Sequence, residues 1–93
     1  KTSKINTEKN QIIDVRKKSE YDLGKVKKAI NICLSTINNH HDQFLSEDHK
    51  FIHCQGGYRS MIACSILKSR GIHNITNIRG GFKQIKNNQN III

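Results

Sequence analysis

Short apolar runs rich in β-branched residues recur along this chain, and segments with helical patterning separate them. The runs lie at residues 11–15, 29–32, 51–54 and 75–78. Strands that alternate with helices in this way are joined by crossover connections and lie parallel in one sheet. We therefore predict an α/β fold with a mostly parallel sheet and helices on both faces. Ligands of such sheets bind at the carboxyl ends of the strands, which is where Asp14, Arg16 and Cys54 lie.

The clearest helix begins at Arg59, where four apolar residues fall on one stripe at helical spacing. Gly71 stands where a left-handed C-terminal cap is expected. Residues 19–23 predict a short helical turn, residues 35–45 a poorly defined helix or loop, and residues 82–86 the start of a final helix.

The chain has 93 residues, which is room for one small domain, and we expect a single domain over residues 1–93. Residues 1–10 form a weak or truncated leading segment and residues 87–93 a tail. The apolar run at residues 91–93 suggests a piece of a longer protein, which would supply a linked or partner domain. No run approaches the roughly 20 apolar residues of a membrane-spanning helix, so we expect a cytoplasmic protein with no membrane partner.

Basic residues outnumber acidic ones, with 16 Lys and Arg against 7 Asp and Glu and a formal charge of +9. Such a charge can attract anions or a nucleic-acid backbone. The basic residues are scattered, however, and few aromatic residues are available as stacking platforms for bases. We therefore expect no nucleic-acid partner, while a general attraction for small anions stays open.

The three cysteines are odd in number and none is closely spaced, which argues against a disulfide framework and against a Cys-x-x-Cys metal or redox motif. Cys64 lies inside a predicted helix with no glycine or cation beside it, so we expect it to be structural. Cys33 follows a strand, and a role in resolving an oxidised or persulfidated Cys54 stays open. Polar helices often carry clusters such as His40-His41-Asp42, so we expect no metal and no cofactor.

Cys54 ends a strand and begins a glycine-rich loop that runs into a helix. A cysteine reacts as its thiolate, which nearby backbone amides and a helix N-terminus stabilise. Gly56 and Gly57 can adopt positive φ, and Arg59 adds a permanent positive charge. We predict that Cys54 is the nucleophile and that Asp14 and Arg16 either hold the loop, meet the substrate or form a structural ion pair. The predicted binding loop comprises Gln55, Gly56, Gly57, Tyr58, Arg59 and Ser60.

From about Ile12 to Ile85, the chain resembles a rhodanese-like sulfurtransferase domain. The motifs that carry the resemblance are Asp14-Val15-Arg16, Glu20-Tyr21 with Gly24, Ala29-Ile30-Asn31-Ile32 with Leu34, the loop from Cys54 to Arg59-Ser60, and Gly80-Gly81-Phe82. The run from His53 to Gly71 is particularly similar to rhodanese domains attached to metallo-β-lactamase-fold enzymes. Two positions depart from the usual family pattern, Lys25 and Cys33, and neither touches the nucleophile.

The resemblance implies a three-layer fold around a five-stranded sheet and a cysteine that carries sulfane sulfur as a persulfide. The implied donors are thiosulfate, polysulfide or another persulfide such as glutathione persulfide, and the implied acceptor is a thiol or cyanide. A cysteine-dependent phosphatase is one alternative, but its loop has five residues between Cys and Arg, whereas four separate Cys54 from Arg59. A catalytically silent binding or regulatory module is the other alternative, although inactive relatives usually lack the cysteine.

Overall fold

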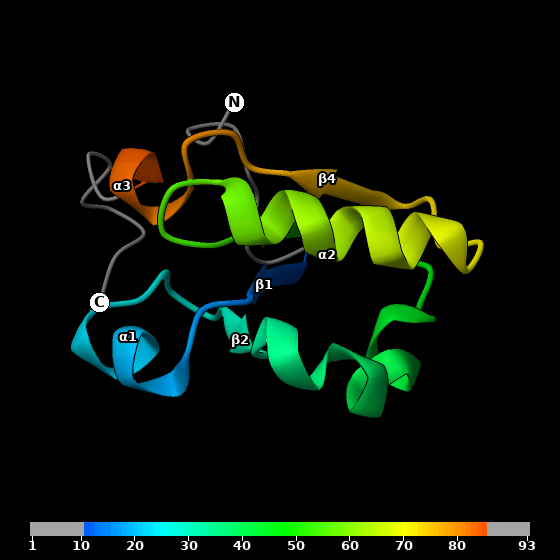
Figure 1. Ribbon diagram of the computed structural model, residues 1–93, viewed down its shortest axis with the longest axis horizontal. Helices are drawn as coiled ribbons and strands as arrows, with labels where there is room; N and C mark the ends of the chain where they lie inside the picture. The colour runs from blue at the N-terminus through cyan, green and yellow to red at the C-terminus, as the bar shows by residue number, and fades with distance from the viewer. Residues whose placement is uncertain (1–10, 86–93) are drawn as a thin grey trace.

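The computed structural model describes residues 11–85, which form one parallel sheet with helices on both faces (Figure 1). The leading segment and the tail predicted from the sequence lie outside the described residues. In chain order the elements are β1 (Gln11–Asp14), α1 (Lys18–Leu23), β2 (Ile30–Asn31), the 3-10 helix η2 (Leu34–Phe44), β3 (Lys50–His53), α2 (Tyr58–Ser69), β4 (Ile75–Asn77) and α3 (Gly81–Ile85).

The sheet has the strand order β2-β1-β3-β4, and every neighbouring pair is parallel. Asp14 is level with Asn31 on one side and with His53 on the other, and Ile52 is level with Asn77. Because all four strands run in one direction, the chain leaves them at the same edge of the sheet. The loop before α2 lies at that edge together with α1 and α3, at the left in Figure 1.

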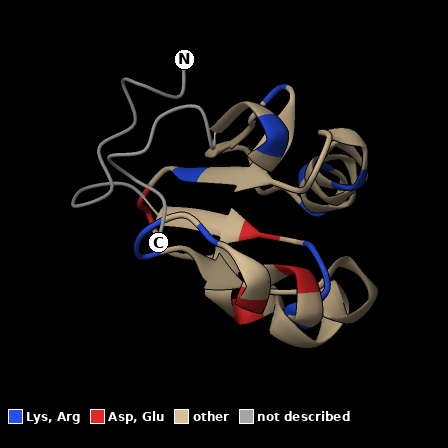
Figure 2. Cartoon of the chain, turned by 90° about the vertical axis from the view of Figure 1, so that its left-hand side faces the viewer, with Lys and Arg blue, Asp and Glu red and all other residues tan. Residues whose placement is uncertain are grey.

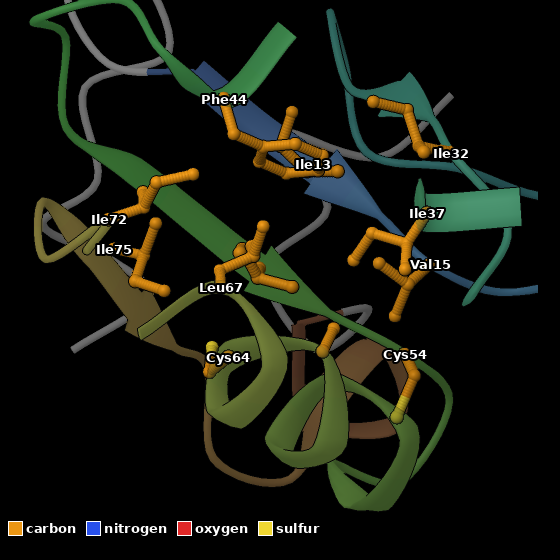
Figure 3. Packing of buried hydrophobic residues seen from close by; sticks show 12 residues of the cluster. Ile13, Val15, Ile32, Ile37, Phe44, Cys54, Cys64, Leu67, Ile72 and Ile75 are labelled. Atoms are coloured by element: carbon orange, nitrogen blue, oxygen red, sulfur yellow. The ribbon is translucent and has the colours of Figure 1, made fainter. Parts of the chain in front are cut away.

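Two apolar clusters fill the space between the layers, one on each face of the sheet. Side chains alternate along a strand, so Ile13 of β1 packs on one face and Ile12 on the other. The larger cluster joins the sheet to α2 and η2 and includes Leu67 and Phe44, as Figure 3 shows. The smaller cluster lies under α1 and α3. The α/β fold predicted from alternating strands and helices is confirmed, and so is the three-layer arrangement that the resemblance implied.

Three details differ from the sequence predictions. The described residues contain four strands, one fewer than the resemblance implied. The stretch predicted as a poorly defined helix or loop over residues 35–45 carries few apolar anchors, and residues 34–44 form a 3-10 helix with non-helical dihedral angles at His40. The helix expected from Arg59 begins at Tyr58, while Gly71 has the predicted left-handed conformation with φ of 85°.

Candidate active site

Cys54 follows β3 directly and lies at the edge of the larger apolar cluster, where only 1% of its surface is exposed (Figure 3). The loop that follows Cys54 folds back over its thiol. The backbone N–H of Gly57 donates a hydrogen bond to Sγ over 3.1 Å. Gly57 has φ of 99°, a left-handed conformation that a residue with a side chain adopts only at a cost. This turn lets α2 begin at the next residue and brings its first amides toward the sulfur.

The surroundings of the thiol favour its ionised form. Burial raises the pKa of Cys54, but the Ser60 hydroxyl and the amides of Ser60, Gly57 and Gly56 offer hydrogen bonds that lower it more. The net result is a pKa below the ordinary value of a thiol. A buried sulfur with several N–H and O–H donors around it can hold a thiolate or another sulfur anion.

Helix α3 holds the loop through backbone hydrogen bonds. The amide of Phe82 donates to the carbonyl oxygen of Cys54 over 2.7 Å, and the amide of Lys83 donates to that of Gln55 over 3.0 Å. This approach requires glycine at the start of α3. A Cβ added to Gly81, which has φ of 58°, would lie 2.3 Å from the carbonyl oxygen of Cys54.

Asp14 and Arg16 form a buried ion pair on the α1–α3 side of the loop. Nη2 of Arg16 lies 2.7 Å from Oδ2 of Asp14, and both side chains are almost fully buried. The same guanidinium donates to the carbonyl of Gly24 over 2.7 Å and to Oε1 of Gln55 over 3.4 Å, and it lies 4.2 Å above the ring of Phe82. Arg16 therefore ties β1 to α1, α3 and the loop.

Arg59 forms a two-pronged ion pair with Glu20 of α1, with Nη1–Oε1 and Nη2–Oε2 distances of 2.7 and 3.0 Å. The Arg59 hydrogen bonds hold the pKa of Glu20 at about 2, and in turn raise the pKa of Arg59. The segment from the end of β1 into α1 alternates between red and blue in Figure 2, which shows how closely the acidic and basic residues are interleaved here. Both guanidiniums predicted near the site thus have a carboxylate partner.

The Rhodanese-like domain family matches residues 2–88 of the chain. This chain belongs to that family. Its domain is 34% identical over 76 residues to "Uncharacterized protein YqhL" of Bacillus subtilis (strain 168) and 26% identical over 72 residues to "Putative sulfur carrier protein YrkF" of the same organism. The aligned part covers 82% and 77% of this chain, but only 60% and 39% of those relatives.

A solved structure of a rhodanese-related protein from Thermoplasma volcanium has the same fold, with a TM-score of 0.85. The match covers 95% of this chain and 87% of that one, at 24% sequence identity. At this identity the likeness concerns the fold alone.

The rhodanese-like domain brings some predicted site residues to the sulfur and directs others elsewhere. Gly56, Gly57 and Ser60 offer donors to Sγ, whereas the side chain of Gln55 contacts Arg16. Arg59 turns to Glu20, and Tyr58 is 71% exposed. Of the two loop glycines, only Gly57 has positive φ.

Sequence reasoning missed two contributors to the site. Glu20 was named only as part of a family motif, yet its ion pair determines where the guanidinium of Arg59 points. Asn77, at the end of β4, accepts a hydrogen bond from the Ser60 hydroxyl. The available signal for Asn77 was its place, because it lies at the carboxyl end of a strand as Asp14 and Cys54 do.

The other cysteines of the rhodanese-like domain lie away from the reactive sulfur. Cys64 is buried on α2, and burial raises the pKa of its thiol to about 11. Cys33 is two strands from Cys54, about 10 Å at the usual strand spacing, whereas a disulfide needs Cα atoms within about 7 Å.

A shallow pocket opens beside the loop, lined by Arg16, Glu20, Leu23, Gly24, Gln55 and Phe82. Within residues 11–85 no group of three or more His, Cys, Asp or Glu side chains is arranged to hold a metal ion. No helix in the same part of the chain has the length and apolar character to cross a membrane.

Proposed function

We propose that this domain is a sulfurtransferase that carries sulfane sulfur as a persulfide on Cys54. The observation that carries the proposal is the Gly57 amide 3.1 Å from Sγ, within a loop whose other donors also lower the pKa of the thiol. Membership of the rhodanese-like family and the likeness to a protein named as a putative sulfur carrier support the same conclusion.

The loading step is a displacement on sulfur. The Cys54 thiolate attacks the sulfane sulfur of thiosulfate, polysulfide or another persulfide, so that a new S–S bond forms. The old bond breaks, and its electron pair leaves with sulfite or with the donor thiolate. Cys54 then holds a persulfide whose terminal sulfur is an anion at neutral pH, and donors around the loop stabilise that anion as they stabilise the thiolate.

The unloading step reverses the roles. An acceptor thiolate, or cyanide in the test tube, attacks the terminal sulfur and takes it, and the Cys54 thiolate leaves. Neither step requires a general base once the thiol is ionised. The lowered pKa of Cys54 therefore serves the domain twice, as attacking group and as leaving group.

The test is the intact mass of the protein after incubation with thiosulfate or glutathione persulfide. We expect one added sulfur atom, localised to the Cys54 peptide and removed by cyanide as thiocyanate. Cys64→Ser and Cys33→Ser are the matched controls and should load normally, whereas Cys54→Ser should not. An unchanged mass with every donor would refute the carrier and leave the silent binding module.

The length of the loop and the position of its arginine also argue against the phosphatase alternative. A phosphate needs a ring of amides wide enough for three oxygens and an arginine free to contact them. Four residues separate Cys54 from Arg59, and the Arg59 guanidinium is held by Glu20. We expect no turnover of p-nitrophenyl phosphate, and Cys54-dependent turnover would reverse this conclusion.

A further inference from the structure

The Ser60 hydroxyl has a single proton and more than one acceptor within reach. Its Oγ lies 3.1 Å from the carbonyl oxygen of Gly57, and it donates to Oδ1 of Asn77. Hydrogen bonding by the same hydroxyl is also among the causes that lower the pKa of Cys54. Ser60 is fully buried, so water cannot replace the hydroxyl as a hydrogen-bond donor to an acceptor that the hydroxyl no longer contacts. Which acceptor receives the proton therefore affects the charge that the sulfur can carry.

Of these acceptors, the Gly57 carbonyl can most easily give up its hydrogen bond from the Ser60 hydroxyl. It already accepts the amide of Met61 over 3.2 Å, as the helix of α2 requires. Asn77 is the acceptor that can change its role. A carboxamide carries an acceptor at one end and donors at the other, and rotation of the group exchanges them.

Asn77 is well placed for this exchange. It is the last residue of β4 and is level with Ile52, so its side chain projects from the sheet face that α2 covers. Apart from Ser60, the structure gives the Asn77 side chain no hydrogen-bond partner within residues 11–85. Rotation of the amide therefore breaks no other hydrogen bond in this part of the chain.

We propose that Asn77 is a positioning residue that directs the Ser60 proton according to the charge on Cys54. With a neutral thiol, the hydroxyl donates to Oδ1 of Asn77. With an anionic sulfur, the amide rotates, Nδ2 donates to Oγ of Ser60, and the hydroxyl donates to the sulfur. A hydrogen bond to an anion is about twice as strong as a neutral one, which drives the exchange. No proton is gained or lost in it.

The inference deepens the sulfur-carrier proposal and rests on that proposal only for its second consequence. Its first consequence is that Asn77 lowers the pKa of the Cys54 thiol through Ser60. Its second is that the same arrangement stabilises the thiolate that leaves when the persulfide passes its sulfur on. The first can be measured without any sulfur donor.

The test is the pH dependence of Cys54 alkylation by iodoacetamide, followed on the Cys54 peptide by mass spectrometry. An aspartate at position 77 can only accept, so Asn77→Asp keeps the Ser60 hydroxyl donating to its carboxylate and adds a negative charge near the sulfur. We expect the midpoint of the Cys54 alkylation profile to rise by about one pH unit. Asn77→Ala removes the donor to Oγ, and we expect a rise of about 0.3 to 0.5 pH unit. A fall in the Asn77→Ala midpoint would mean that Asn77 only competes for the proton, and would overturn the proposal.

A double-mutant cycle separates the hydroxyl from simple charge. We expect most of the Asn77→Asp effect to disappear in a Ser60→Ala background. If the shift persists undiminished, or if Thr76→Asp on the other side of the strand produces it equally, charge alone explains it and the proposal is wrong. Circular dichroism checks that each variant is folded, and the rate of sulfur release to cyanide should fall several-fold in Asn77→Asp. A domain that never takes up sulfur refutes the carrier, while the alkylation midpoints still decide the role of Asn77.

Discussion

The amide of Phe82 donates a 2.7 Å hydrogen bond to the carbonyl oxygen of Cys54, and through it the start of α3 fixes the residue that carries the reactive sulfur. The contact joins two segments that the sequence separates by α2 and β4. It also explains why the chain carries Gly81 before Phe82, since the backbones of α3 and the loop approach one another without a side chain between them.

Gly81→Ala should therefore disrupt the loop more than backbone strain alone would. The added Cβ would lie 2.3 Å from the Cys54 carbonyl oxygen and 2.8 Å from that of Gln55, so we expect a loss of about 3 kcal/mol in the free energy of unfolding. Gly71→Ala is the matched control, because Gly71 also has positive φ but a Cβ there meets nothing within 4 Å. It should cost about 1 kcal/mol. Urea unfolding measures both, and equal losses would contradict the contact.

Asp14→Ala should be strongly destabilising, because it leaves the buried guanidinium of Arg16 without its carboxylate. Breaking a buried pair from one side costs about 3 to 5 kcal/mol, a large part of the stability of a domain this size. Lys18→Ala, which breaks the exposed pair with Asp22, should cost less than about 0.5 kcal/mol. Thermal and urea unfolding compare the two. A small effect of Asp14→Ala would mean that water reaches Arg16.

The strand positions and the Cys54 loop could be predicted from the sequence, because apolar periodicity and glycine act locally. The left-handed conformation of Gly57 was predictable in this sense, since a strand that passes into a helix within four residues needs a left-handed turn. The partner of Arg59 was not predictable in the same way. Glu20 lies 39 positions away, and only the packing of α1 against the loop brings the two side chains together.

The same reasoning explains why the type of helix at residues 34–44 could not be predicted and why Asn77 was missed. Residues 35–45 carry few apolar residues, so their helical type depends on how Ile37 and Phe44 fit the core rather than on a repeating pattern. Asn77 resembles many polar residues that end a strand. Its role follows from the hydroxyl of Ser60 opposite, which the linear sequence does not reveal.

The three thiols should differ in their reactivity with iodoacetamide. The lowered pKa of Cys54 means that its thiolate fraction, and hence its rate, rises and levels off at a lower pH than for an ordinary thiol. The pKa of Cys64 is about 11, so little of it is thiolate at neutral pH, and it should react far more slowly there than Cys54. Peptide-resolved mass spectrometry across the pH range checks this. Equal rates for Cys54 and a small-molecule thiol at every pH would refute the lowered pKa.

Cys33→Ser should leave sulfur loading and release unchanged, because Cys33 follows β2, which lies two strands from the β3 strand that leads into Cys54. The Sγ of Cys33 lies 3.3 Å from the hydroxyl of Ser35, and the hydroxyl of a serine at position 33 can make the same contact. The rates of sulfur uptake from thiosulfate and of release to cyanide provide the measurement. A loss of release in Cys33→Ser, together with a Cys33–Cys54 disulfide by mass, would restore the resolving role that the sequence left open.

Glu20→Gln should remove a contribution to stability that depends on pH. Arg59 holds the pKa of Glu20 at about 2 in the folded chain, below its ordinary value of 4.5. A lowered folded pKa means that the contribution is fully present above pH 4.5 and disappears as the pH falls toward 2. Because both side chains are about one third exposed, we expect about 1 kcal/mol at pH 7. Urea unfolding of the parent and of Glu20→Gln should therefore give free energies that differ at pH 7 and converge near pH 2. Asp22→Asn, on the exposed face of α1, should change stability by less than about 0.5 kcal/mol. A constant difference between parent and Glu20→Gln down to pH 2 would mean that the carboxylate stabilises the fold by packing and not by its charge.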